Sequence, residues 1–223
     1  MLNTKSLVDQ IYETLLLRIR NLEYKPGMRI NLDKLKEEFS VSTAPIREAL
    51  QRLAKDNIII VKPRIGFNVA SLTKEDVENV FETRKLLESY CLRISIKTED
   101  KESLISIRAT MLGLKKQLET EDPPSEELVK ECIEIDDFLH RNILIGNCSN
   151  KFILNFYDTL DNFSSIIRHF SFRLKEDIAQ HIAIVEAMIE PDLAKAEERL
   201  ITHLDRAKMA TIDWISRASL KKE

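Results

Sequence analysis

Hydrophobic residues in the first part of the chain follow helical spacing. From Ser6 to Asn21 they recur at steps of three and four residues, which predicts one face of an amphipathic helix. Pro26-Gly27 breaks this pattern, and Asn31 suits the N-cap of a short second helix. A third helix is expected to begin near Pro45, because proline is favoured in a first helical turn.

Two short β-prone runs follow these three helices. They are Ile58–Val61 and Phe67–Ala70, and the residues between them include Pro63 and Gly66, which suit a tight hairpin. Two helices joined by a tight turn form a helix-turn-helix, and the hairpin adds a wing. Residues 1–72 are therefore predicted to be a winged helix-turn-helix domain.

The rest of the chain, residues 73–223, shows no strand pattern but a series of long amphipathic segments. The first opens at Thr73, and the others run over Lys101–Thr120, Glu126–Ile145, Lys151–Phe170, Leu174–Ile189 and Asp192–Ser219. About six antiparallel helices are expected to form a bundle, whose core is a usual place for metal and small-ligand sites. The predicted fold class is mainly α, with a winged helix followed by a helical bundle.

Composition agrees with this fold class and also indicates where in the cell the protein is expected. A content of 43% hydrophobic and 32% charged residues, with only four Gly and six Pro, is typical of a mostly helical globular protein. The chain has no apolar signal region and no run of eighteen apolar residues, so we expect a cytoplasmic protein with no membrane partner. Three cysteines without C-x-x-C spacing favour reduced thiols over disulfides.

Charge separates the two predicted domains. Residues 1–72 hold 12 Lys and Arg against 8 Asp and Glu, a net charge of +4, and the remainder carries −7. A basic first domain indicates a polyanionic partner for that part of the chain.

Candidate DNA contacts lie on the third helix and on the wing. Arg47 and Gln51 share the face opposite the buried one, and Arg52 and Lys55 are placed to reach backbone phosphates. Arg64 at the wing tip is placed to enter a minor groove or contact a phosphate. The planar fork of arginine offers two parallel donors to guanine or phosphate. The alternative is a winged helix that binds protein and carries ordinary solvated charges.

Four residues of the predicted bundle are candidate metal ligands. Asp136 and His140 stand four residues apart and project from one helix face. His181 lies about ten residues before the break at Glu190–Asp192 and His203 about eleven after it, so both are roughly 15 Å from it and can face each other. Three imidazoles and a carboxylate suit zinc, nickel or manganese.

Other interpretations of these residues remain open. A histidine on an apolar helix can be an ordinary core residue, and Asp136 can simply pair with His140. Cys132, one turn before Asp136, is a second candidate ligand. A metal-dependent enzyme is possible in principle, since an open His/carboxylate site can activate water. The chain has no H-E-x-x-H motif, and its acids Glu134 and Glu197 lie on helix surfaces.

The residues of the third helix identify a family resemblance. The S-R-T-P-V-R-E-A-L segment of GntR-type bacterial transcription regulators is similar to Ser42-Thr43-Ala44-Pro45-Ile46-Arg47-Glu48-Ala49-Leu50. Thr43 stands where that family usually has Arg, and Ala44 where it usually has Thr, so the usual operator preference is not carried over. The resemblance implies contacts to operator DNA from Ser42, Thr43, Arg47, Gln51, Arg52, Arg64 and Gly66.

The candidate ligands extend the resemblance to the second domain. Asp136-Asp137-Phe138-Leu139-His140, followed by His181 and His203, resembles the metal-binding pattern of the FCD effector domain of the FadR subfamily. That domain is a helical bundle in which a divalent metal and a small carboxylate effector meet. Arg84 begins a segment similar to the family's R-x-x-L-E, which implies an effector-binding role; a structural salt bridge is the alternative.

Together these features predict a ligand-responsive bacterial transcription regulator. A homodimer is expected, because one small domain reads few base pairs and two half-sites supply more specificity. An effector controls such a protein only if its affinity differs between DNA-competent and incompetent states. The alternatives are a metal-dependent enzyme acting on a small carboxylate and a regulator whose metal is purely structural.

Overall fold

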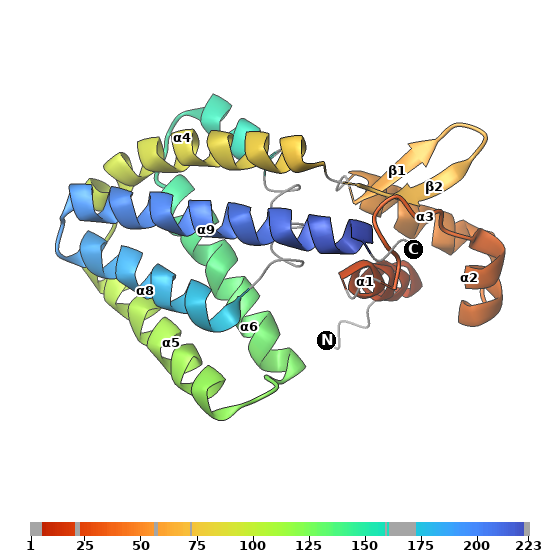
Figure 1. The fold of residues 1–223 in the computed structure, drawn as a ribbon, viewed down its shortest axis with the longest axis horizontal. Helices are drawn as coiled ribbons and strands as arrows, with labels where there is room; N and C mark the ends of the chain where they lie inside the picture. The colour runs from red at the N-terminus through yellow and green to blue at the C-terminus, as the bar shows by residue number, and fades with distance from the viewer. Residues whose placement is uncertain are drawn as a thin grey trace. The chain divides into compact units, whose positions relative to one another are not determined.

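A computed structural model describes residues 6–20, 23–55, 58–71, 73–158, 160 and 173–220 (Figure 1). These residues are mainly helical and include one two-stranded hairpin, so the predicted fold class is confirmed. Contacts divide the chain into two compact units, one containing Met1–Lys74 and the other containing Glu75–Asp161 and Ser171–Trp214. The helices of the described residues include none with the length and apolar character needed to span a bilayer.

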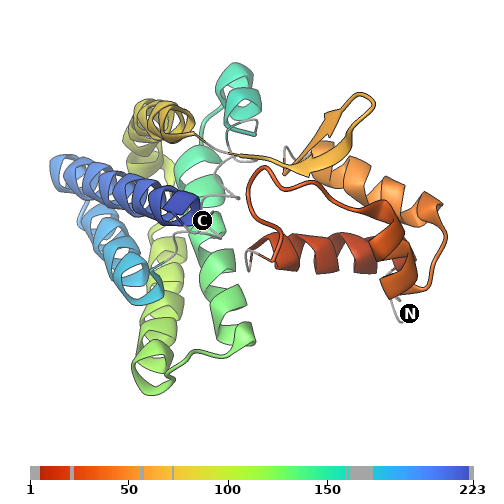
Figure 2. The same cartoon turned by 45° about the vertical axis from the view of Figure 1, so that its right-hand side comes forward.

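The first unit contains three helices and the hairpin. Its elements are α1 (Leu7–Arg20), α2 (Leu32–Phe39), α3 (Thr43–Lys55), β1 (Ile59–Lys62) and β2 (Gly66–Val69). The red α1 packs along the orange α3 (Figure 2). A continuous apolar core joins all of these elements, with Leu15, Leu35 and Leu50 fully buried.

Local hydrogen bonds explain where α2 begins. The predicted cap is confirmed, because Asn31 Oδ1 accepts from the backbone N–H groups of Asp33 at 2.9 Å and Lys34 at 3.1 Å. The expected start of α3 near Pro45 is two residues late, since the helix begins at Thr43.

The wing is wider than the predicted hairpin. β1 and β2 pair antiparallel with Ile59 opposite Val69, and Gly66 opens β2 with a φ of +111°, which favours glycine. The stretch before α2 adds to the free edge of β2: Ile30 N–H donates to Phe67 O at 2.9 Å, and Val69 N–H donates to Met28 O at 2.9 Å. The stretch around Met28, Arg29 and Ile30 is too short to show an alternating pattern in the sequence.

The second unit is a helical bundle. Its elements are α4 (Lys74–Thr98), α5 (Lys101–Thr120), α6 (Glu126–Asp137), a π-helix η1 (Phe138–Ile145), α8 (Leu174–Ile189) and, up to Trp214, α9 (Leu193–Leu220). α5 packs against α8 and α6, and ion pairs Lys85–Asp205 and Arg93–Glu197 join α4 to α9. The predicted helix Lys151–Phe170 is helical over 151–158, and most of its remainder lies outside the described residues.

The predicted helix Glu126–Ile145 is helical along its whole length, but its second part is not an α-helix. From Phe138 the backbone follows a π-helix, whose hydrogen bonds run between residues five apart. At its end the Ile143 carbonyl accepts from Ser95 Oγ at 2.6 Å and from Asn147 Nδ2 at 3.3 Å. A hydrophobic pattern at steps of three and four residues is compatible with either helix type, so the sequence does not separate them.

Gly146 ends the π-helix where no larger residue fits. A Cβ at this position would lie far inside van der Waals contact of the Asn142 carbonyl. We expect Gly146→Ala to destabilise the protein by about 1–3 kcal/mol, because backbone must move to make room. In a chain of this length that lowers Tm by roughly 2–4 °C per kcal/mol, which thermal unfolding followed by circular dichroism measures.

Gly113 provides the matched control for this substitution. It lies exposed within α5, and a Cβ there would meet nothing within 4 Å. Gly113→Ala should leave Tm unchanged or raise it, since alanine is the better helix former. Equal Tm values for the two variants would contradict a close approach at Gly146.

Candidate metal centre and DNA-binding surface

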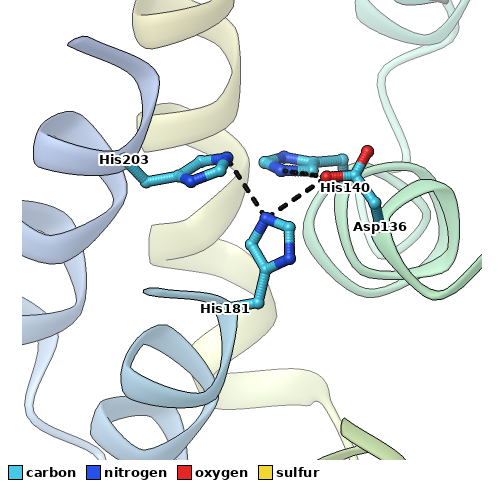
Figure 3. A group of neighbouring side chains, drawn as sticks. All are labelled: Asp136, His140, His181 and His203. Carbon is cyan, nitrogen blue, oxygen red and sulfur yellow. Dashed lines mark hydrogen bonds and ion pairs between the residues drawn. The ribbon is translucent and has the colours of Figure 1, made fainter. Parts of the chain in front are cut away.

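The four predicted ligands come from four different elements and meet in the interior of the second unit (Figure 3). Asp136 lies at the end of α6, His140 on η1, His181 on α8 and His203 on α9. One potential ligand atom from each lies within 4.8 Å of the others, and all four side chains are buried. Because all four are buried, their polar atoms face one another rather than bulk solvent.

The distances suit a single small cation. His181 Nε2 lies 3.2 Å from His203 Nε2 and 3.3 Å from Asp136 Oδ1, and His140 Nε2 lies 3.9 Å from the same oxygen. Ligand bonds of about 2.0–2.1 Å in tetrahedral geometry place neighbouring donor atoms roughly 3.3 Å apart. The donor set of three imidazoles and one carboxylate therefore fits zinc or a similar divalent ion in spacing as well as in chemistry.

Burial also keeps the imidazoles of His181 and His203 in the uncharged form that binds metal. It lowers the pKa of His181 to about 4, although Asp136 opposes the shift. The pKa of His203 lies well below its usual value for the same reason, with the neighbouring His181 adding to the effect. His203 Nδ1 lies 3.1 Å from Gln180 Oε1, which can only accept a hydrogen bond. The Nε2 atom of His203 is thereby left with its lone pair.

A buried ion pair lies behind His140. Arg84 Nε donates to Glu88 Oε1 at 2.6 Å, and Glu88 Oε2 lies 2.7 Å from His140 Nδ1. Burial alone would raise the pKa of Glu88, but the charge of Arg84 and the close contact with His140 outweigh it and lower that pKa to about 2. The salt-bridge alternative for Arg84 is thus present in the structure, and its contact with an effector stays a prediction. Glu88 itself was not predicted as a site residue.

Cys132 does not join the group. Burial and then the neighbouring Glu131 raise its pKa to about 11, which keeps the thiol protonated near neutral pH. Its sulfur is absent from the cluster of potential ligand atoms found among the described residues.

A hollow of about 610 Å³ lies in the first unit and is lined by residues of both α3 and the wing. Its lining includes three predicted DNA-binding residues, Thr43, Arg47 and Gly66. It also includes Arg29, which sequence reasoning did not select and which lies in the strand-like stretch beside β2. The sequence signal that could have drawn attention to Arg29 is the turn-forming pair Pro26-Gly27, which shortly precedes it.

The predicted DNA-binding residues differ in how they are held. Arg47 and Arg64 are exposed, and neither forms an ion pair with another of the described residues. Ser42 and Gln51 are also exposed. Arg52 instead binds Asp9 Oδ1 at 2.6 Å and lies over the Tyr12 ring at 4.9 Å. These two contacts hold Arg52 of α3 against α1, and they compete with its predicted contact to a DNA phosphate.

The chain thus combines a winged helix with a helical domain that buries a His/Asp group, and comparison with known proteins shows that this is a class of bacterial regulators. The model of bacterial regulatory proteins of the gntR family matches residues 7–69, and the FCD domain model matches residues 79–206. The FCD match alone spans more than half of the chain.

Individual relatives are similar along most of their length. The HTH-type transcriptional regulator YdhC of Bacillus subtilis is 30% identical over 202 residues, 88% of this chain and 87% of YdhC. The HTH-type transcriptional repressor GlaR of Escherichia coli is 24% identical over 191 residues, 81% of this chain and 84% of GlaR. The structure of E. coli McbR/YncC matches with a TM-score of 0.64 at 18% identity, over 99% of this chain and all of that chain.

The chain therefore belongs to the GntR family of bacterial regulatory proteins and carries an FCD domain. The predicted resemblance is confirmed. Membership makes the protein a transcription regulator and removes the metal-dependent enzyme from the alternatives.

Loss of two imidazoles tests the candidate metal centre. We expect the double variant His181→Ala, His203→Ala to lose the bound ion, because it keeps only two of four donors. Protein loaded with zinc, freed of excess metal and analysed by elemental analysis reports the ion content per chain. Cys132→Ala is the control and should keep the wild-type content. Retention of one ion per chain by the folded double variant would exclude the site.

Proposed function

We propose that this protein is a metal-containing, ligand-responsive transcription regulator that acts in the cytoplasm, without a membrane partner, and binds operator DNA as a homodimer. The observation that carries the proposal is the buried group Asp136, His140, His181 and His203, which lies in the domain that follows a DNA-binding winged helix. A regulator needs a sensing site apart from its DNA-reading surface, and this group supplies a chemically specific one.

The four residues would hold a divalent transition ion such as zinc, nickel or manganese. When bound, the ion would act as a Lewis acid, and a carboxylate oxygen of a small effector would complete its coordination. Asp136 would supply the negative charge that partly balances the ion, and the three imidazoles would supply neutral donors. The effector is proposed to be a small carboxylate, with Arg84 as its predicted partner near the centre.

DNA reading is assigned to the exposed side of α3 and to the wing. Thr43, Arg47 and Gly66 line one hollow, and Arg29 adds a second guanidinium at its edge. Two exposed arginines beside a hollow suit the phosphates and base edges of a duplex. Ser42 and Gln51 lie on the same helix or its start, and Arg64 lies at the wing tip.

A substitution on α3 tests DNA reading. Arg47→Ala should weaken binding to DNA selected from random duplexes by the wild-type protein, by about 1–3 kcal/mol, or roughly five- to 150-fold in Kd. Gel-shift titrations at fixed salt measure this. Arg93→Ala is the control, because Arg93 is an exposed arginine of the second unit paired with Glu197. Unchanged binding by Arg47→Ala would remove DNA reading from this face of α3.

Native mass spectrometry tests assembly and metal content together. We expect gently purified protein to give a mass near twice 25.9 kDa, increased by one metal ion per chain. Small carboxylates added to this protein should bind to the metal-loaded form and not to protein stripped with a chelator. A metal-loaded dimer that binds none of them would favour the alternative of a structural metal, and a metal-free monomer would contradict the proposal.

A further inference from the structure

The side of His140 that faces away from the other ligands is held by a charged pair on α4. Arg84 and Glu88 stand one helical turn apart and are 2% and 0% exposed. One carboxylate oxygen of Glu88 accepts from Arg84 Nε at 2.6 Å, and the other lies 2.7 Å from His140 Nδ1. A charged carboxylate in so buried a position has few partners, and His140 is one of them.

The short contact decides which ring nitrogen carries the proton. An ionised carboxylate can only accept hydrogen bonds, and the ion pair with Arg84 favours the ionised form. A lone pair on His140 Nδ1 would repel the oxygen at 2.7 Å, so Nδ1 must carry the hydrogen and donate it. Arg84 Nη2 also lies 3.2 Å from Nδ1, but a donation from there would require the repulsive tautomer.

The opposite ring nitrogen then points its lone pair at the candidate metal centre. His140 Nε2 faces Asp136 Oδ1 at 3.9 Å, and within the described residues it has no hydrogen-bond partner. A neutral imidazole has a single N–H, so a proton fixed on Nδ1 leaves Nε2 ready to bind a cation.

We propose that Glu88 is a positioning residue that fixes His140 as an Nε2 metal ligand, and that Arg84 acts by holding Glu88. The proposal rests on the proposed metal centre. A carboxylate behind a metal-bound histidine orients the ring and raises its basicity, and the loss of such a partner typically weakens metal binding about 10- to 100-fold.

The other two histidines are held less firmly. His203 Nδ1 faces the neutral amide oxygen of Gln180 at 3.1 Å, and His181 Nδ1 is buried with no hydrogen-bond partner in the described residues. Hydrogen bonds to charged acceptors are shorter and stronger than those to neutral ones. His140 is therefore the ligand whose orientation depends most on a neighbouring side chain.

The variant must remove the charge of Glu88 without leaving Arg84 buried alone. The double variant Arg84→Met, Glu88→Gln removes both charges and keeps side chains of similar length. Its glutamine can present either an acceptor oxygen or a donor N–H to His140 Nδ1, so the tautomer is no longer fixed. Gln180→Ala is the matched comparison, because it removes the neutral partner of His203.

Metal affinity is the first measurement. Zinc binding to the full-length protein, followed by competition with a chromophoric chelator, should be about 10- to 100-fold weaker in the double variant. Gln180→Ala should have the smaller effect. An unchanged zinc affinity in a double variant with wild-type secondary structure and Tm would overturn the proposal.

The second measurement does not depend on metal. Long-range proton–nitrogen spectra of metal-free protein labelled at its four histidines report which ring nitrogen is protonated. Wild-type His140 should carry its proton on Nδ1, and the double variant should show a mixture of tautomers. Protonation of wild-type His140 on Nε2 would also overturn the proposal, and this result stands even if the variant does not fold. Failure of the wild type to bind zinc would instead contradict the metal centre.

Discussion

Burial of four ionisable side chains in one place is the constraint on which much of the second unit depends. Asp136, His140, His181 and His203 are each at most 4% exposed. A buried polar group without a partner costs roughly 1–3 kcal/mol, so such a cluster persists only when its neighbours or a ligand satisfy it. Bonds to an ion would offset that cost, and the stability of the bundle would then depend on the ion.

α4 supports this cluster with a polar stripe on its buried side. Arg84, Glu88 and Ser95 lie at spacings of four and seven residues, so they face the same direction. All three contact the π-helix, since Glu88 and Arg84 meet His140 and Ser95 donates to the Ile143 carbonyl. α4 thus provides hydrogen-bond partners both for a backbone carbonyl of η1 and for the ring of His140, which faces the other candidate ligands.

The four candidate ligands could be selected from the sequence because their signals are local. Asp136 and His140 stand four residues apart, and a single turn relates His181 to His203. The partner of His140 could not be found in this way. Arg84 and Glu88 at a spacing of four residues have the pattern of an ordinary surface ion pair. Glu88 and His140 are 52 residues apart in the chain, so only the tertiary structure shows that they are in contact.

The same limit applies to the first unit and to the backbone. The tie between Arg52 and Asp9 joins residues 43 positions apart, so the spacing on α3 alone makes Arg52 equivalent to Arg47. The π-helix escaped prediction because apolar spacing does not report which hydrogen bonds the backbone makes. Prediction thus succeeded for the fold class and the cap and placed four candidate ligands that the structure brings together, whose metal binding stays a prediction. It failed where distant side chains decide the outcome.

Regulation by an effector requires a structural element whose conformation depends on both the effector site and the DNA-binding surface. α4 has the connections that this role needs in the proposed regulator. It begins at Lys74, with only four residues between it and the end of β2 at Val69, so the wing and α4 are nearly continuous in the chain. Through Glu88 it also contacts His140. In the proposed regulator, an ion or effector that shifted His140 would therefore act on α4 through a charge-assisted hydrogen bond, whose strength depends on distance and direction.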